Sequence, residues 1–162
     1  MLAHSLGTYQ ITKASIGNLD VRDKPFQYNY TFVVPSYAKT AGELLLVRPR
    51  VLGEKSSDIL EKKEARKYPV EFEGPRKDTD RIEISLPEGY EVDELPPPVD
   101  VDYPFGSYHS RTAVQGKSIM YTRVFEIKKV SVPLDMTEEL KRFYRVIGGD
   151  ERSTAVLKPA GK

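Results

Sequence analysis

The sequence predicts a mainly β protein, namely an antiparallel β-sandwich of the immunoglobulin-like or Greek-key type with one C-terminal helix before a final strand. In most hydrophobic segments, apolar and polar residues alternate with a period of two, which is typical of half-buried strands. Turn residues punctuate these segments at short intervals, as they do in β-sandwiches. One segment near the C-terminus has the helical period instead. Together these patterns predict roughly eight or nine strands and a single helix.

The strand pattern is clearest in "RIEISL" (81–86), "YNYTFVV" (28–34) and "SIMYTRVFEIKKVSV" (118–132). In the second of these, Tyr28, Tyr30 and Phe32 share one face. In the third, an arginine joins an otherwise apolar face, which consists of Ile119, Tyr121, Arg123, Phe125 and Ile127. Further strands are predicted in "TYQITKAS", "ELLLVRP", "YPVEFE", "GSYHSRTAVQ" and "TAVLK".

Turns are predicted at Ile16-Gly17-Asn18, at Pro87-Glu88-Gly89-Tyr90 and at Val114-Gln115-Gly116-Lys117. The second turn lies in the stretch "RIEISLPEGYEVDELPPP" (81–98), where proline ends one strand and three prolines stiffen the exit from the next. We interpret this stretch as a crossover between strands and not as a site of chemistry.

The helix is predicted in "LDMTEELKRFYRVIGGD", which carries apolar residues at i, i+3, i+4 and i+7. Asp135 and Glu138 have the spacing of a capping box, and Gly148-Gly149 can end the helix in a left-handed C-cap. The segment 52–67, "LGEKSSDILEKKEARK", has too few apolar residues for a firm helix and is interpreted as a charged loop.

The length of 162 residues suits one domain, predicted over 8–158 between a disordered start at 1–7 and a tail at 159–162. The net charge of +1 provides no field to attract nucleic acid, and no apolar run is long enough to span a membrane. The chain has no cysteine, which excludes disulfides, thiolate zinc sites and a cysteine nucleophile. With no phosphate-binding glycine loop either, we expect no cofactor and no metal.

The candidates for chemistry are few. Of the two histidines, His4 lies in the predicted disordered start, whereas His109 lies in a strand close to two serines. A serine hydrolase built on His109 would need a serine and an orienting acid within hydrogen-bond reach, and strand alternation aims neither Ser107 nor Ser110 at it. We therefore interpret His109 as a histidine on a strand surface.

Two further groups of residues have both a functional and a structural interpretation. The acid pairs Asp78/Asp80 and Asp100/Asp102 have the i, i+2 spacing of one strand face and could contribute to a calcium site, but a solvated face is favoured. Tyr103, Phe105 and Tyr108, together with His109, could form a contact surface for sugar or peptide. The alternative is that these aromatic residues fill the core and its rim.

The order of the segments from about Gly7 to Lys158 resembles the uncharacterised domain that follows the transglutaminase-like core in many bacterial proteins. The matching pieces are "RKYPV", the run I-x-L-P-x-G-Y-x-V-x-x-L-P (84–96), "FGSY", "YTRVFEI", the helix and the closing "AVLK". In such proteins a papain-like core with a Cys-His-Asp triad precedes this domain. The resemblance therefore implies that the triad lies upstream, and it transfers no catalytic residue to this chain.

From this resemblance we expect a non-catalytic accessory domain that positions the transglutaminase-like core or holds a protein partner. The resemblance also implies export, to the periplasm or outside the cell, with Met1 as a cloning start. If the natural chain starts at Met1, the expected location is cytoplasmic. The alternative function is a carbohydrate- or cell-surface-binding module, and a third is the stand-alone hydrolase built on His109.

Overall fold

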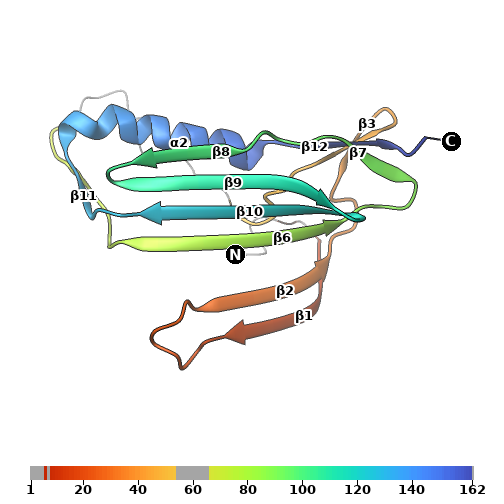
Figure 1. Cartoon of the computed structure of the whole chain (residues 1–162), viewed down its shortest axis with the longest axis horizontal. Helices are drawn as coiled ribbons and strands as arrows, with labels where there is room; N and C mark the ends of the chain where they lie inside the picture. The colour runs from red at the N-terminus through yellow and green to blue at the C-terminus, as the bar shows by residue number, and fades with distance from the viewer. Residues whose placement is uncertain (1–5, 7, 54–65, 162) are drawn as a thin grey trace. The chain divides into compact units, whose positions relative to one another are not determined.

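The computed structural model describes residue 6, residues 8–53 and residues 66–161. The chain divides into two compact units, Met1–Tyr37 and Ala38–Lys162 (Figure 1). The domain predicted over 8–158 therefore contains parts of two such units. Most of the predicted start at 1–7, and most of the charged loop predicted at 52–67, lie outside the described residues.

The first unit contains one antiparallel hairpin, formed by β1 (Gln10–Gly17) and β2 (Gln27–Val33). Both strands fall within one or two residues of the segments predicted for them. Ile16 is paired with Tyr28 and Ala14 with Tyr30, and a register shift between Ile11 and Lys13 marks a bulge.

The second unit is mainly β, and all its sheets are antiparallel (Figure 1). Its larger sheet has the order β6-β10-β9-β8, with bounds Arg76–Ser85, Ser118–Ile127, Gly106–Gln115 and Val99–Tyr103. Strands β9 and β10 form a hairpin in which Ser118 is paired with Gln115 and Ile127 with Gly106. Gly116 has a φ of +61° in the connecting turn, a conformation that glycine adopts without strain.

A second four-stranded sheet has the order β3-β4-β12-β7, with bounds Lys39–Ala41, Leu44–Val47, Ala155–Pro159 and Tyr90–Glu94. A short third sheet pairs β5 (Val70–Glu71) with β11 (Ser131–Val132). Strand β12 is the final strand and follows the helix α2 (Thr137–Arg152). The predicted fold class, antiparallel β with a helix before a final strand, is confirmed, and the two four-stranded sheets are consistent with a β-sandwich.

The stretch 81–98 carries the chain from one sheet to the other and back, because β6 and β8 belong to the larger sheet and β7 to the second. Gly89, with a φ of +77°, makes the first turn, and its carbonyl accepts a hydrogen bond of 2.8 Å from the Ala160 amide near β12. Pro96 is buried, whereas Pro97 and Pro98 are exposed. The crossover predicted from the prolines is thus a crossover between sheets.

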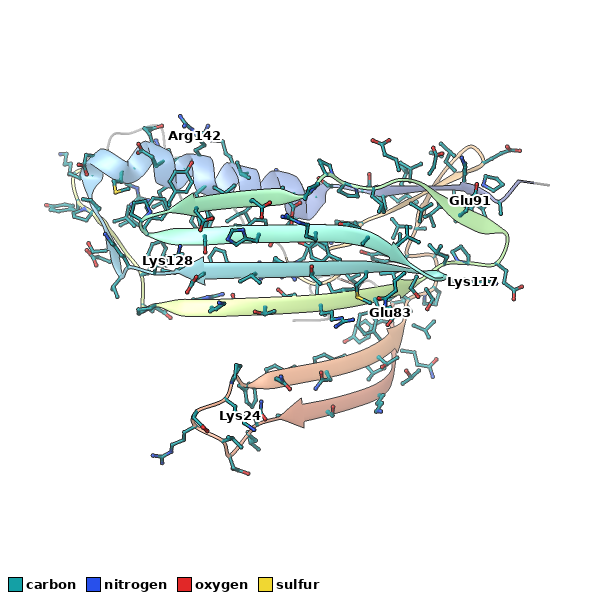
Figure 2. The ribbon with its side chains drawn as sticks, in the orientation of Figure 1. Lys24, Glu83, Glu91, Lys117, Lys128 and Arg142 are labelled. Atoms are coloured by element: carbon teal, nitrogen blue, oxygen red, sulfur yellow. The ribbon has the colours of Figure 1, made fainter. Side chains whose placement is uncertain are left out.

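The core of the second unit lies between the larger sheet and α2 (Figure 1). The helix contributes Leu140, Phe143 and Ile147, three residues of the predicted apolar stripe. From the strands and the connections next to them come Phe105, Tyr108, Phe125, Ile127 and Val132. On the side of the helix turned away from the sheet, Arg142 points to solvent (Figure 2).

Both ends of the helix differ from the sequence prediction. A 3₁₀ turn, η1 (Leu134–Met136), contains Asp135, and α2 starts after it with Met136 as N-cap and no side-chain cap. At the other end, α2 continues through Gly148 and Gly149 to Arg152. The predicted capping box is therefore wrong, because Asp135 lies inside η1 and Met136 occupies the N-cap position. The predicted glycine C-cap is also wrong, because contacts of Asp150 and Glu151 with the sheet hold one further helical turn in place.

The position of Phe143 against Phe105 and Phe125 gives a test of this core. Its ring centroid lies 5.7 Å from that of Phe105 and 6.1 Å from that of Phe125. We expect Phe143→Ala to lower the free energy of unfolding by about 3–5 kcal/mol, since the lost ring leaves a cavity. Urea unfolding followed by circular dichroism measures this loss.

The matched control is Tyr68→Ala, because the Tyr68 side chain is 78% exposed. That variant should stay within about 0.5 kcal/mol of the parent. Equal losses in the two variants would contradict the assignment of Phe143 to the core.

Candidate functional site

The second unit buries charged side chains where the end of α2 meets the larger sheet. Arg123 is 2% exposed and Glu151 is fully buried. Burial of an unpaired charge is very costly, so each such group requires partners. We name the set of interacting polar side chains at this place the buried network, which consists of Arg50, Asp80, Tyr108, Tyr121, Arg123, Asp150 and Glu151.

Arg123 lies at the centre of the buried network. Its Nε donates to Asp80 Oδ2 and its Nη1 to Glu151 Oε1, both at 2.8 Å. Arg50 adds a second positive charge, with Nη1 2.9 Å from Asp80 Oδ2 and Nε 3.7 Å from Glu151 Oε1. Two guanidinium groups thus face two carboxylates, and the four formal charges cancel.

Two tyrosine hydroxyls complete the buried network around Asp150. Tyr108 donates to Asp150 Oδ2 at 2.6 Å and Tyr121 donates to the same oxygen at 3.3 Å. The Arg123 guanidinium lies 6.0 Å from the centre of the Tyr108 ring, at the outer limit of a cation–π contact. The helix residues Asp150 and Glu151 are therefore bound directly to β9 and β10, and Arg123 links them to Asp80 of β6.

Strand register explains how the sequence builds this network. Arg123 of β10 lies directly opposite Asp80 of β6, and alternation turns Arg123 to the same face as Tyr121 and Phe125. An arginine inside an apolar stripe was visible in the sequence. Its acidic partners were not, because Asp80 and Glu151 lie 43 and 28 residues away in the chain.

The surroundings of the buried network shift the pKa values of Arg123, Tyr108 and Tyr121. Burial by itself would lower the pKa of Arg123, but the charges of Asp80 and Glu151 outweigh it and raise the pKa. Burial raises the pKa of Tyr108 well above its ordinary value and that of Tyr121 to about 12. Near neutral pH both hydroxyls therefore keep their protons and Arg123 keeps its charge, which favours a structural role for these three groups.

A second polar group, here named the outer-face cluster, lies on the opposite face of the larger sheet. It consists of Asp100, Asp102, His109, Arg111 and Lys128. His109 Nδ1 lies 2.9 Å from Asp100 Oδ1 and Nε2 3.5 Å from Asp102 Oδ2. Hydrogen bonds from Arg111 and then from His109 lower the pKa of Asp100. Lys128, which follows β10, donates to Asp102 at 3.3 Å (Figure 2).

The structure places His109 on a strand face, as predicted, and separates it from the arrangement that a hydrolase needs. Ser107 shares its face, but the Ser107 hydroxyl donates to Glu126 Oε2 at 3.3 Å. Ser110 is buried on the other face. His4 lies outside the described residues. In the described part of the chain, no group of three or more histidine and acidic residues is placed to hold a metal ion.

The predicted aromatic contact surface falls mostly in the core. Phe105 and Tyr108 are buried, and Tyr103 is half-buried with its ring stacked on Phe105 at 5.1 Å. Alternation along β8 and β9 turns the rings of Tyr103 and Tyr108 toward α2, and Phe105, in the turn between these strands, packs against Phe143. Phe105 and Tyr108 are therefore not available to a ligand. Of the four residues proposed for this surface, His109 alone lies on the outer face.

The two acid pairs also have partners of their own. Asp78 pairs with Arg76, and Asp80 belongs to the buried network. Asp100 and Asp102 belong to the outer-face cluster, where cations of the same sheet neutralise them. The solvated-face interpretation is thus incomplete for Asp80, because its half-buried carboxylate binds the buried side chains of Arg50 and Arg123.

Comparison with known proteins gives one family and one solved structure. Residues 43–157 match a family described as a domain of unknown function with a solved structure, DUF3858. The solved structure is a "putative protease" from Parabacteroides distasonis, with a TM-score of 0.52 and 12% identity. The alignment covers 61% of this chain and 20% of the other, so the chain spans about a fifth of the protein it matches. No curated protein matches. Within the described residues, no helix is long and apolar enough to cross a membrane.

The buried position of Arg123 predicts a large effect of its removal. We expect Arg123→Met to lower the free energy of unfolding by about 3–5 kcal/mol, because two carboxylates lose their closest positive charge. Arg111→Met is the matched control, since Arg111 pairs with Asp100 on an exposed face at 2.5 Å. It should cost less than about 1 kcal/mol. If urea unfolding gave the same loss of unfolding free energy for Arg123→Met and Arg111→Met, burial would not strengthen the contacts of Arg123.

The raised pKa of Tyr121 predicts a loss of stability at alkaline pH. Its pKa is about 12 in the folded protein and near 10 when unfolded, so its contribution is fully present below about pH 10 and is lost between pH 10 and 12. Between pH 9 and pH 11, Tyr121→Phe should therefore lose less stability than the parent. Tyr68→Phe, at an exposed position, should follow the parent. Identical pH profiles for the parent and Tyr121→Phe in urea unfolding would contradict this assignment.

Proposed function

Because this chain belongs to the DUF3858 family and its fold matches a fifth of a much longer chain, we propose that it is a non-catalytic accessory domain of a larger bacterial protein. In that protein it follows a transglutaminase-like, protease-related core and positions that core or holds a protein partner. The observation that carries the proposal is the coverage: 61% of this chain aligns with 20% of a chain named as a putative protease.

The chemistry of the second unit supports a role in positioning. Its buried charges bind one another, and the tyrosines beside them keep their protons near neutral pH. On the outer face, His109 contacts two carboxylates while Ser107 bonds to Glu126, so the residues of a serine hydrolase point to other partners. A sheet and helix fixed in this way form a rigid platform for a neighbouring domain.

The partner in this proposal is the core of the same polypeptide or another protein, and not nucleic acid or the interior of a membrane. The formal charge of the chain, +1, offers little attraction for a polyanion. If the larger protein is exported, the domain acts in the periplasm or outside the cell.

A carbohydrate-binding role is the second candidate. The rings of Tyr28 and Tyr30 in the hairpin are within 9° of parallel and stacked, with centroids 6.1 Å apart. They are 60% and 41% exposed, so sugar rings could stack on them. The aromatic residues first considered for this role, Phe105 and Tyr108, are buried.

The proposal is tested on the product of the complete reading frame. We expect a papain-like cysteine core upstream, and a peptide-hydrolysis or transamidation activity that falls by roughly tenfold or more when Ala38–Lys162 is deleted, because a misplaced core loses its geometry. The 162-residue chain alone should be inactive in the same assay. A reading frame that starts at Met1 would refute the proposal. So would an activity of the short chain that His109→Ala abolishes, and that result would favour the hydrolase.

A further inference from the structure

The hairpin of the first unit has one apolar and one polar face. The register places apolar residues of both strands together on one face, namely Ile11, Ala14, Ile16, Tyr28, Tyr30 and Phe32. We name this set the hairpin face. The opposite face carries Lys13, Ser15, Gln27, Asn29 and Thr31, along with Gln10, Gly17 and Val33. Such one-sided patterning is typical of a sheet that covers a core.

The hairpin face has no core to cover among the described residues of its own unit. Four of its side chains, Ile11, Ile16, Tyr28 and Tyr30, are 41–60% exposed. The segment between the strands adds three more exposed apolar residues, Leu19, Val21 and Phe26. A two-stranded hairpin is at best marginally stable in water, and a contiguous apolar patch on it is typical of an interaction surface.

The hairpin lies outside the part of the chain that matches the family. The match begins at residue 43, and the hairpin ends at Val33, within the unit Met1–Tyr37. Residues 10–33 therefore lie outside the part of the chain that the family model matches.

The size of the hairpin face argues against a freely dissociating partner. Taking roughly 150–250 Å² for a fully buried aromatic residue, six partly exposed side chains offer on the order of 400–500 Å². Specific complexes bury about 800 Å² on each partner, so a second copy of this chain would be held weakly. A partner in the same polypeptide requires less area, because a short tether supplies a local concentration in the millimolar range.

The chemistry of the hairpin face specifies the kind of partner. It carries no acidic, basic or amide side chain, whereas a sugar site needs such groups to bond the hydroxyls. The tyrosines are adjoined by the aliphatic side chains of Ile11, Ala14 and Ile16. An apolar protein surface can bury the aliphatic and the aromatic side chains together.

We propose that the hairpin face docks on an apolar surface of the domain that precedes it in the larger polypeptide, the core invoked under the proposed function, on which this inference rests. Burial of Tyr28, Tyr30, Ile11 and Ile16 stabilises the hairpin and couples the family domain to the core. The hairpin is then the connecting element between the two, and the family domain begins after it.

Hydrogen–deuterium exchange over Gln10–Gly17 tests this docking by comparing the complete reading-frame product with the 162-residue chain. A hairpin that is docked at least 90% of the time should exchange about tenfold more slowly in the longer protein. Amides of Gly106–Gln115 in the second unit are the internal control and should exchange equally in both. This comparison of lengths requires no substitution, so it holds even where a variant fails to fold.

Matched variants of the longer protein then identify the face. Tyr28→Ser with Tyr30→Ser should abolish the slowing, whereas Asn29→Ser with Thr31→Ser, on the polar face of the same strand, should preserve it. Abolition by the polar pair alone would overturn the proposal, because it would place the contact on the other face.

Other results would overturn the proposal in distinguishable ways. Equal exchange of Gln10–Gly17 in both lengths would remove the docking but leave the accessory function in place. If amide exchange of Gln10–Gly17 in the 162-residue chain became slower as the protein concentration rose, a second copy of the chain would be the occupant. If this exchange were already slow in the 162-residue chain at every concentration, the occupant would lie within the 162 residues. If exchange became slow only after an oligosaccharide was added, a sugar would be the favoured ligand. A reading frame that starts at Met1 would refute the accessory function itself.

Discussion

The second unit depends on one buried guanidinium. Arg123 lies between Asp80 of β6 and Glu151 of α2, with 2.8 Å to each carboxylate. Because neither carboxylate can move away without leaving a buried charge uncompensated, the position of the helix end relative to the sheet is restricted to one register. Strand β12 begins at Ala155, four residues after Glu151, so the same contact determines where the chain enters the second sheet.

Buried ion pairs of this kind add less to stability than their distances suggest, because removing both charges from water is costly. Their clearer effect is geometric. An apolar helix stripe packs against an apolar sheet in several similar positions, whereas the hydrogen bonds from Arg123 and Tyr108 to neighbouring helix residues fit only one. The second unit thus combines a nonspecific apolar core with a specific polar contact at one end of it.

The two units differ in what they present to solvent. The outer face of the larger sheet carries polar side chains that pair with one another in the outer-face cluster. The hairpin face is apolar and exposed, and it gains free energy from any surface that covers it. The shared face of Tyr28, Tyr30 and Phe32 follows from the sequence, whereas the contact surface predicted at 103–109 consists mostly of buried side chains. Alternation identifies a face, and only the tertiary structure decides whether a second layer covers it.

The sequence by itself determined the local structure, because that depends on neighbours along the chain. Alternation predicted β9 at its observed bounds, Gly116 predicted the hairpin turn, and the i, i+3, i+4, i+7 pattern predicted the helix stripe. Only the tertiary structure decided that β7 leaves the sheet of β6 and β8, that α2 continues past Gly148-Gly149, and that Arg123 has acidic partners. Each of these depends on residues tens of positions apart, whose contact energies outweigh the weak local preferences for a cap or a turn.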